Sequence, residues 1–271
     1  MSRPTKEFHQ YLTNSSKSHV SHTEYLVSPA TAFLKFTVEA KSSIDLCIRY
    51  FPKNQDGNYK KDSLDSLQHL VIAVLPTIMG HFETYQRYLF SGIFEMSIYL
   101  ENFDANKFFK QLQKETAIEF DWSRVSAYRS IGTGSIGSLL ADTISGWHDP
   151  AKVNKYFSAF NLQYTLFSND KIENLKTLWQ LRHSIVHTGG TLSRADAQKV
   201  EALKEYGDNN ICLENQFIFE VARKLHPIVK NATIGIGNKF KENLISSISE
   251  EESKKIDKFF EVKSSVSTWL R

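Results

Sequence analysis

Apolar residues recur every three or four positions through a long stretch of the chain, residues 65–99. This spacing places them on one broad face of an α-helix, which predicts a long amphipathic helix with that face buried. Because proline removes a backbone donor, Pro76 should kink the helix or mark a join between two helices. The apolar positions are Leu67, Leu70, Val71, Val74, Leu75, Ile78, Phe82, Tyr85, Leu89 and Phe90.

A second stretch, residues 170–187, has the same periodicity and clear signals at both ends. Asp170 is a suitable N-cap, and the pair Gly189-Gly190 is typical of a helix terminus because glycine readily adopts the left-handed conformation. We therefore predict a helix that ends close to His187. Its apolar residues are Ile172, Leu175, Leu178, Trp179, Ile185 and Val186.

Shorter patterns surround these two helices. Residues 31–40 allow either a short helix or a strand, and residues 52–61 form a polar turn. Ser193 opens a variant of the capping box, which predicts a helix to about Tyr206. Further helices are expected at residues 104–119, 136–147, 153–160 and 216–229.

Together these patterns predict a mainly α protein, a helical bundle with additional helices and a small irregular or β element near the N-terminus. We expect an N-terminal arm at residues 1–60, a helical domain at 61–235 and a C-terminal helical tail at 236–271. Of the 271 residues, 41% are hydrophobic and 13% aromatic, which is enough to bury a substantial core.

The charge and the cysteine content limit the partners and the cellular compartment that we expect. The formal net charge is only +3 at pH 7, so a nucleic-acid surface would have to be local. Cys47 and Cys212 lie far apart, and we expect neither a disulfide framework nor a zinc cluster. The N-terminal residues lack an apolar signal core, and the longest apolar run, 70–79, is about half the length that crosses a bilayer. We expect a soluble, cytoplasmic protein without a membrane partner.

Arg182 and His187 stand at the end of the second predicted helix, and both residue types suit the cleavage of RNA. Histidine titrates near neutral pH, so it can take a proton from a ribose 2′-hydroxyl or give one to a leaving 5′-oxygen. An arginine fork can hold a phosphate and stabilise the charge that develops on it. Five residues of helix separate the two side chains by about 140° around the axis. One helix therefore presents an incomplete site, which a second copy of the chain would complete.

The segment 178–190 (LWQLRHSIVHTGG) resembles the signature of the HEPN superfamily (higher eukaryotes and prokaryotes nucleotide-binding). That signature is an arginine, a polar residue, a few further residues and a histidine. His183 fills the polar position here, and Gly189-Gly190 fits the glycine that often follows the histidine. Upstream, residues 81–85 (HFETY) resemble the F-E-x-Y region of an earlier HEPN helix. The similarity covers these two windows and is closest to RNase-L-like and abortive-infection HEPN proteins.

The resemblance implies a HEPN-like bundle that cleaves RNA without a metal or another cofactor, as a homodimer. The products would carry a 2′,3′-cyclic phosphate and a 5′-hydroxyl, and the setting would be a toxin or antiphage defence system, with a defence-system or antitoxin protein as a further partner. His187 would be the acid/base and Arg182 the phosphate ligand. His183 would orient the substrate, Ser184 would assist, and Glu83 would hold Arg182 in position.

Other interpretations of the same residues stay open. Basic side chains near a helix C-terminus also stabilise the helix dipole. The alternative hypothesis is that the HEPN-like bundle is a non-catalytic module that binds RNA or a nucleotide, or that mediates dimerisation. His183 and His187 have metal-ligand spacing but no third ligand at motif spacing. Residues 132–137 (GTGSIG) spell G-x-G-x-x-G without the preceding strand of a dinucleotide site, which favours a loop.

Overall fold

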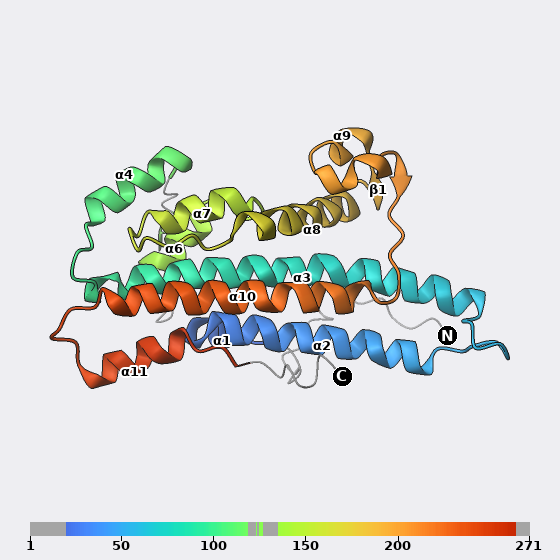
Figure 1. The fold of residues 1–271 in the computed structure, drawn as a ribbon, viewed down its shortest axis with the longest axis horizontal. Coiled ribbons are helices and arrows are strands. Elements are labelled where there is room, and N and C mark those ends of the chain that lie inside the picture. Colours follow the sequence, from blue (N-terminus) through green and yellow to red (C-terminus); the bar gives the residue numbers. More distant parts are fainter. Residues whose placement is uncertain (1–19, 119–122, 124, 127–134, 264–271) are drawn as a thin grey trace.

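The computed structural model describes residues 20–118, 123, 125–126 and 135–263. Three long helices lie side by side along the molecule: α2 (Pro29–Tyr50), α3 (Lys61–Met96) and α10 (Phe217–Glu242) (Figure 1). A second layer, which contains α7 (Pro150–Ser158) and α8 (Asn169–His187), covers α3 on the side away from α2. The protein is therefore mainly helical, as expected.

Helix α3 forms the centre of the bundle. It begins at Lys61 and runs through Pro76 to Met96, where the 3-10 turn η2 (Ser97–Tyr99) follows. Of the two outcomes expected at Pro76, a kink or a join between two helices, the join is wrong, because one helix continues through the proline. Residues 61–99 are long and apolar enough to cross a membrane, by length and composition alone. A single helix of this kind is weak evidence for a membrane, because the core helix of a globular bundle meets the same criteria, although only 33% of the apolar window is buried here.

Residues 31–40, which the sequence leaves open between helix and strand, are helical. They belong to α2, which has Pro29 in its first turn and buries Ala30, Phe33 and Leu34. α1 (His22–Val27) precedes it, with Ser21 as N-cap. α2 packs directly on α3, across the expected boundary between residues 60 and 61. The region before residue 60 therefore contributes to the same core, while residues 1–19 lie outside the described residues.

An aromatic cluster joins the far end of α3 to the second layer. The ring of Phe90 lies 5.1 to 6.1 Å, centroid to centroid, from those of Phe108, Phe157 and Phe160. Phe108 belongs to α4 (Ala105–Glu115) and Phe157 to α7. α6 (Ile136–Thr143) packs on α3 in the same region. The predicted helices at 104–119 and 136–147 are thus confirmed with shorter bounds, and the helix predicted at 153–160 begins and ends earlier, as α7. Residues 132–134 of the glycine-rich motif lie outside the described residues.

The chain after α8 forms a small irregular unit of the fold. β1 (Thr191–Leu192) pairs antiparallel with β2 (Asn209–Asn210), and between them lie the short helix α9 (Arg194–Ala197) and the 3-10 helix η3 (Glu201–Tyr206). Ser193 caps α9 by accepting a hydrogen bond from the backbone N–H of Asp196, as the capping-box pattern predicts. The single helix expected to Tyr206 is wrong. The strand pair also lies here rather than near the N-terminus, where the polar turn holds an isolated bridge between Lys53 and Tyr59.

The C-terminal part of the described chain folds back on the bundle. α10 continues without interruption across the expected boundary between residues 235 and 236. α11 (Glu250–Phe259) follows it and buries Ile256 and Phe259. Phe260, directly after α11, packs its ring 5.5 Å from that of Phe240 on α10. The C-terminal helix is therefore part of the same core rather than a separate tail.

Candidate functional site

Helix α8, which carries Arg182, His183 and His187, has one buried and one exposed face. Leu175, Leu178, Trp179 and Leu181 are buried, and the ring of Trp179 lies 6.4 Å from that of Phe82 on α3. The helix begins after Ser168, which is the N-cap, rather than at Asp170. It ends at His187, as predicted, and Gly189 and Gly190 follow with φ of 62° and 85°.

A single carbonyl oxygen fixes this helix end. The carbonyl of Ser184 accepts hydrogen bonds from the backbone N–H of Thr188 and of Gly190, both at 3.1 Å, and from the Thr188 hydroxyl at 2.7 Å. Carbonyls of the last helical turn lack partners within the helix, so these bonds satisfy one of them and order the turn that holds His187.

His183 and His187 form an exposed pair on the last turn of α8. Their ring centroids are 4.7 Å apart, as expected for residues four apart on one helical face. Partial burial lowers the pKa of His183, and the positive charges of Lys199 and Arg182, together with His187, lower it further, while Asp196 opposes this. A lowered pKa keeps the imidazole neutral at physiological pH, which is the form that accepts a proton.

Arg182 lies next to this pair and is half-buried. Its Nε–H is buried and has no hydrogen-bond partner among the described residues. The indole N–H of Trp179, three residues earlier on the same helical face, is likewise buried without a partner in that part of the chain. An unsatisfied buried donor costs about 1–3 kcal/mol. The Trp179 ring packs against Phe82 and His148, at 6.4 and 6.3 Å between ring centroids, so of the two donors only that of Arg182 belongs to a residue directly next to the histidine pair in the sequence.

Two charged residues that no sequence pattern indicates lie near the histidine pair: Asp196 on α9, and Lys199 two residues after the end of that helix. Asp196 is buried, and its Oδ1 accepts a hydrogen bond from Lys199 Nζ at 2.6 Å. This hydrogen bond holds the pKa of Asp196 below its ordinary value. α9 packs against α8, and both residues act electrostatically on His183. No spacing in the sequence signals this contact, because the strand pair and the glycine turn bring α9 back onto α8.

Ser184 does not lie with the histidines. It is fully buried, and its hydroxyl accepts a hydrogen bond from Gln180 Nε2 at 3.3 Å. Its position on α8 turns it toward the core, one residue away from the exposed His183. The expected assisting role in catalysis is therefore wrong in this arrangement, and Ser184 acts on the helix end through its carbonyl.

Glu83 is also engaged elsewhere. Its Oε1 accepts hydrogen bonds from Arg87 Nε at 2.9 Å and from Arg87 Nη2 at 2.7 Å. Arg87 also donates to the Ala141 carbonyl at 3.0 Å and forms an ion pair with Asp142 at 3.3 Å. The expected pairing of Glu83 with Arg182 is therefore wrong. The next basic residue on the same helix, one turn away, reaches the carboxylate first.

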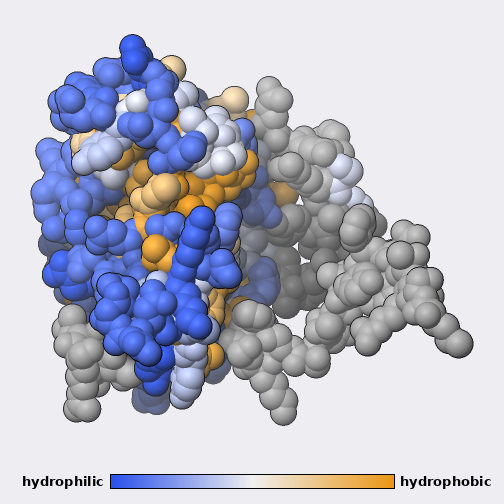
Figure 2. Space-filling model, turned by 90° about the vertical axis from the view of Figure 1, so that its right-hand side faces the viewer, coloured by the Kyte–Doolittle hydropathy of each residue, from blue (hydrophilic) through white to orange (hydrophobic). Residues whose placement is uncertain are grey.

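The end of the molecule that holds this site exposes apolar surface. Figure 2 views the molecule from the side on which α8 ends and α3 begins, and it shows an apolar area framed by hydrophilic residues. Val186, which directly precedes His187 on α8, is 48% exposed, and Leu64 and Leu70 near the start of α3 are each 38% exposed. An apolar area of this kind beside a polar site is typical of an interaction surface.

Within the described ranges, no group of three histidine, cysteine or acidic side chains is arranged to hold a metal ion. No family model matches the chain, and no curated protein and no solved structure matches it either. The local sequence similarity to the HEPN signature and the geometry at the end of α8 therefore carry the functional proposal together.

Proposed function

We propose that the protein is a cytoplasmic, metal-independent endoribonuclease of the HEPN type, active as a homodimer in toxin or antiphage defence. The observation that carries the proposal is the exposed His183–His187 pair beside the unsatisfied Nε–H of Arg182. Acid/base groups and a phosphate-binding fork are the groups that transesterification of RNA requires.

In the proposed reaction, a histidine takes the proton of the ribose 2′-hydroxyl. The 2′-oxygen then attacks the adjacent phosphorus, and the bond from phosphorus to the 5′-oxygen breaks. A protonated histidine donates to the leaving 5′-oxygen, so that the products are a 2′,3′-cyclic phosphate and a 5′-hydroxyl. Arg182 stabilises the charge on the non-bridging oxygens. His187 is our candidate for direct proton transfer, and His183, whose pKa is lowered mainly by burial, orients the substrate.

The second copy would complete the site. Arg182 is half-buried while His187 is exposed, in keeping with the angle of about 140° between them around α8. Exposed Val186 lies on the same helical turn and offers apolar contact for a partner helix. A symmetric contact through α8 would bring two arginine–histidine sets together, because a two-fold interface uses the same patch on both copies.

The decisive experiment incubates the purified full chain with RNA in EDTA and maps the product ends. We expect 2′,3′-cyclic phosphate and 5′-hydroxyl ends. We expect no cleavage on the 3′ side of a nucleotide whose 2′-hydroxyl is replaced by hydrogen. Cleavage that requires an added metal ion, or that proceeds at a 2′-deoxy position, would contradict the mechanism. Binding of RNA without cleavage would instead favour the non-catalytic module.

A further inference from the structure

An apolar cavity lies at the opposite end of α3 from the start of that helix, between α1, α3 and α11. Its volume is about 580 Å³, which falls within the range of about 300–1,000 Å³ typical of sites that hold one small ligand. α1 provides Leu26 and Val27, α3 provides residues between Tyr88 and Met96, and α11 provides residues between Glu251 and Phe259. The candidate ribonuclease site shares none of these residues.

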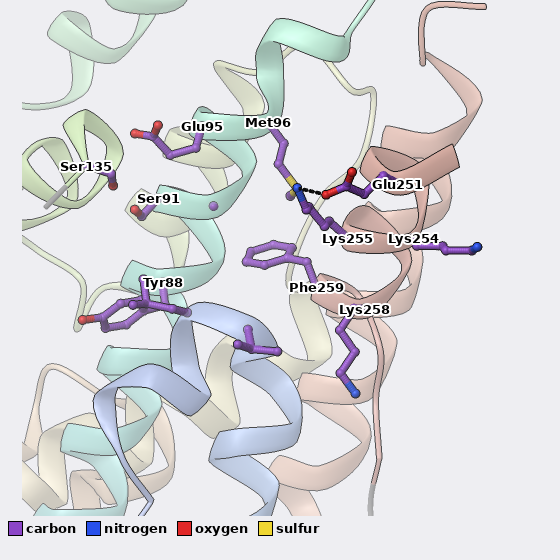
Figure 3. Close-up of a pocket in the computed structure, with 13 residues that line it drawn as sticks. Tyr88, Ser91, Glu95, Met96, Ser135, Glu251, Lys254, Lys255, Lys258 and Phe259 are labelled. Carbon is purple, nitrogen blue, oxygen red and sulfur yellow. Dashed lines mark ion pairs between the residues drawn. The ribbon is translucent and has the colours of Figure 1, made fainter. Parts of the chain in front are cut away.

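The wall of the cavity depends on one glycine. A Cβ atom at Gly92 would lie 2.2 Å from two carbons of the Phe259 ring, so only glycine lets α11 pack this closely on α3. Figure 3 shows the Phe259 ring between the two helices, with Tyr88 and Ser91 on the α3 side. Val27 on α1 is 50% exposed although it lines the cavity. The interior is therefore apolar and open to solvent at the side of α1.

The lining contains three lysines, all on α11, of which Lys255 is paired with both Glu251 and Glu252. Lys254 and Lys258 stand four residues apart on one face of α11 and point outward in Figure 3. Lys254 pairs with Glu250 and Lys258 with Glu261, both at 2.6 Å, and both lysines are more than half exposed. Such exposed pairs contribute little to stability, so an incoming anion can compete for these lysines at small cost.

The acidic side chains at the rim are already engaged. Glu95 accepts a hydrogen bond from the backbone N–H of Gly137 at 2.5 Å, at the N-terminus of α6, which favours a carboxylate. Glu251 pairs with Lys255 at 3.0 Å. Inside the cavity, the Ser91 hydroxyl bonds to that of Ser138 at 3.1 Å. An apolar interior with two exchangeable cations at its edge is complementary to a hydrocarbon chain that ends in an anion.

We propose that this cavity binds a long-chain fatty acid, with the hydrocarbon chain between Val27, Met96 and Phe259 and the carboxylate at Lys254 and Lys258. The hydrocarbon chain covers the apolar wall that is now exposed, which is the main source of binding energy. The two lysines select an anionic head group over a neutral or cationic one.

Isothermal titration calorimetry of the full chain with fatty acids below their critical micelle concentration tests this inference. We expect saturable binding of palmitate at one site per chain, and an affinity that rises about three- to fourfold per added methylene from octanoate until the cavity is full. Hexadecyltrimethylammonium, which has the same chain and a cationic head, should bind at least tenfold more weakly. Equal binding of the two amphiphiles, or no saturable binding of palmitate, would overturn the proposal.

Two pairs of variants place the ligand. Val27→Glu introduces a charge into the mouth of the cavity and should weaken palmitate binding at least tenfold, whereas Leu46→Glu, at a residue that is 53% exposed on α2, should leave it unchanged. The double variant Lys254→Gln/Lys258→Gln should lower the affinity on the order of tenfold. Its control, Lys176→Gln/Lys239→Gln, removes two exposed, ion-paired lysines elsewhere and should have no effect.

Failure has a distinct signature. If Val27→Glu binds palmitate as the wild type does, the fatty acid lies elsewhere and the inference is wrong. If the chain sediments with phosphatidylglycerol vesicles but does not bind monomeric palmitate, the surface is a membrane contact and the inference is again wrong. None of these measurements uses RNA, so their outcome is separate from that of the proposed ribonuclease.

Discussion

Two half-buried arginines, Arg87 on α3 and Arg182 on α8, differ in whether the protein satisfies their hydrogen-bond donors. Around Arg87, Glu83, Asp142 and the Ala141 carbonyl satisfy the guanidinium, whose Cζ lies 5.7 Å from the ring centroid of Trp147. Around Arg182, the buried Nε–H has no partner among the described residues, and two histidines stand exposed beside it. The difference teaches that a half-buried guanidinium whose donors are satisfied within the protein is not available to a substrate, in contrast to an exposed ion-paired lysine.

The largest effect is expected when the candidate catalytic side chains of α8 are removed. His187→Ala should lower the rate of RNA cleavage by about a hundredfold to ten-thousandfold, and Arg182→Ala by about a hundredfold to a thousandfold, because acid/base and electrostatic groups contribute on this scale. The measurement is single-turnover cleavage of a defined RNA, with the melting temperature as the check on folding. His69→Ala, at an exposed histidine of α3, is the control and should cleave normally. Unchanged cleavage by His187→Ala would remove this residue from the mechanism.

A substitution of Arg87 tests the arginine whose hydrogen bonds are satisfied within the protein. Arg87→Ala leaves Glu83 and the Ala141 carbonyl without their partner, so we expect a loss of about 2 kcal/mol in the free energy of unfolding and an unchanged cleavage rate per folded molecule. Urea denaturation measures the first quantity. Arg223→Ala, which removes an exposed pair with Glu220, should change the free energy of unfolding much less than Arg87→Ala does. If Arg87→Ala abolishes cleavage while the fold remains intact, the two arginines are functionally connected.

A smaller effect is expected from the glycine stop that orders the α8 site. Gly190 has a φ of 85°, so Gly190→Ala should cost about 1–2 kcal/mol in the free energy of unfolding and should reduce cleavage. Gly80→Ala is a matched control, since Gly80 lies inside α3 and a methyl group there would meet no other atom within 4 Å. That change should stabilise the protein by about 0.5–1 kcal/mol. Equal effects of the two substitutions would show that the turn conformation does not matter.

The smallest expected effect concerns the protonation of His183. Burial and nearby positive charges depress its folded-state pKa, so the folded protein takes up its proton less readily than the unfolded chain. This contribution to stability is present above the unfolded pKa of about 6.5 and is lost as the pH falls toward the folded value. An NMR titration of the imidazole should give a midpoint below that of the unfolded chain. Asp196→Asn should lower the midpoint further, and His187→Ala should raise it. A rise in Asp196→Asn would contradict the proposed electrostatics.

The sequence was sufficient for features that depend on local order. The apolar periodicity predicts α3 and α8 closely, and the glycine pair predicts the end of α8 after His187. Both features depend on residues that are close together in the sequence. The short segment 31–40 could not be assigned, since a few residues fit both periods. Pro76 left two outcomes open, a kink or a join, and the sequence could not decide between them, because the packing of α3 on its neighbours decides whether the helix continues through the proline.

The site was predictable only in part, for a physical reason. Arg182, His183 and His187 lie together because they share the last turns of one helix. Contacts between residues of different elements depend on how the helices pack against one another, and this packing cannot be derived from the local sequence pattern. The pairing of Glu83 with Arg87 rather than Arg182 and the approach of Asp196 to His183 both depend on it. The burial of Ser184 was within reach, since it lies three residues after Leu181 on the same inward face.

The shortness of α9 has a consequence for how the site behaves in time. This four-residue helix is held by a strand pair of only two residues on each side and by a few buried residues of the same segment, among them Leu192, Ala197 and Val200. Few hydrogen bonds need to break for the segment to open, whereas exchange of the amides of α3 requires disruption of the whole core. Backbone amides between residues 191 and 210 should thus exchange with deuterium long before those of α3. Asp196 and Lys199 would leave His183 with each such opening, so that the chemical environment of this histidine alternates while the bundle stays intact.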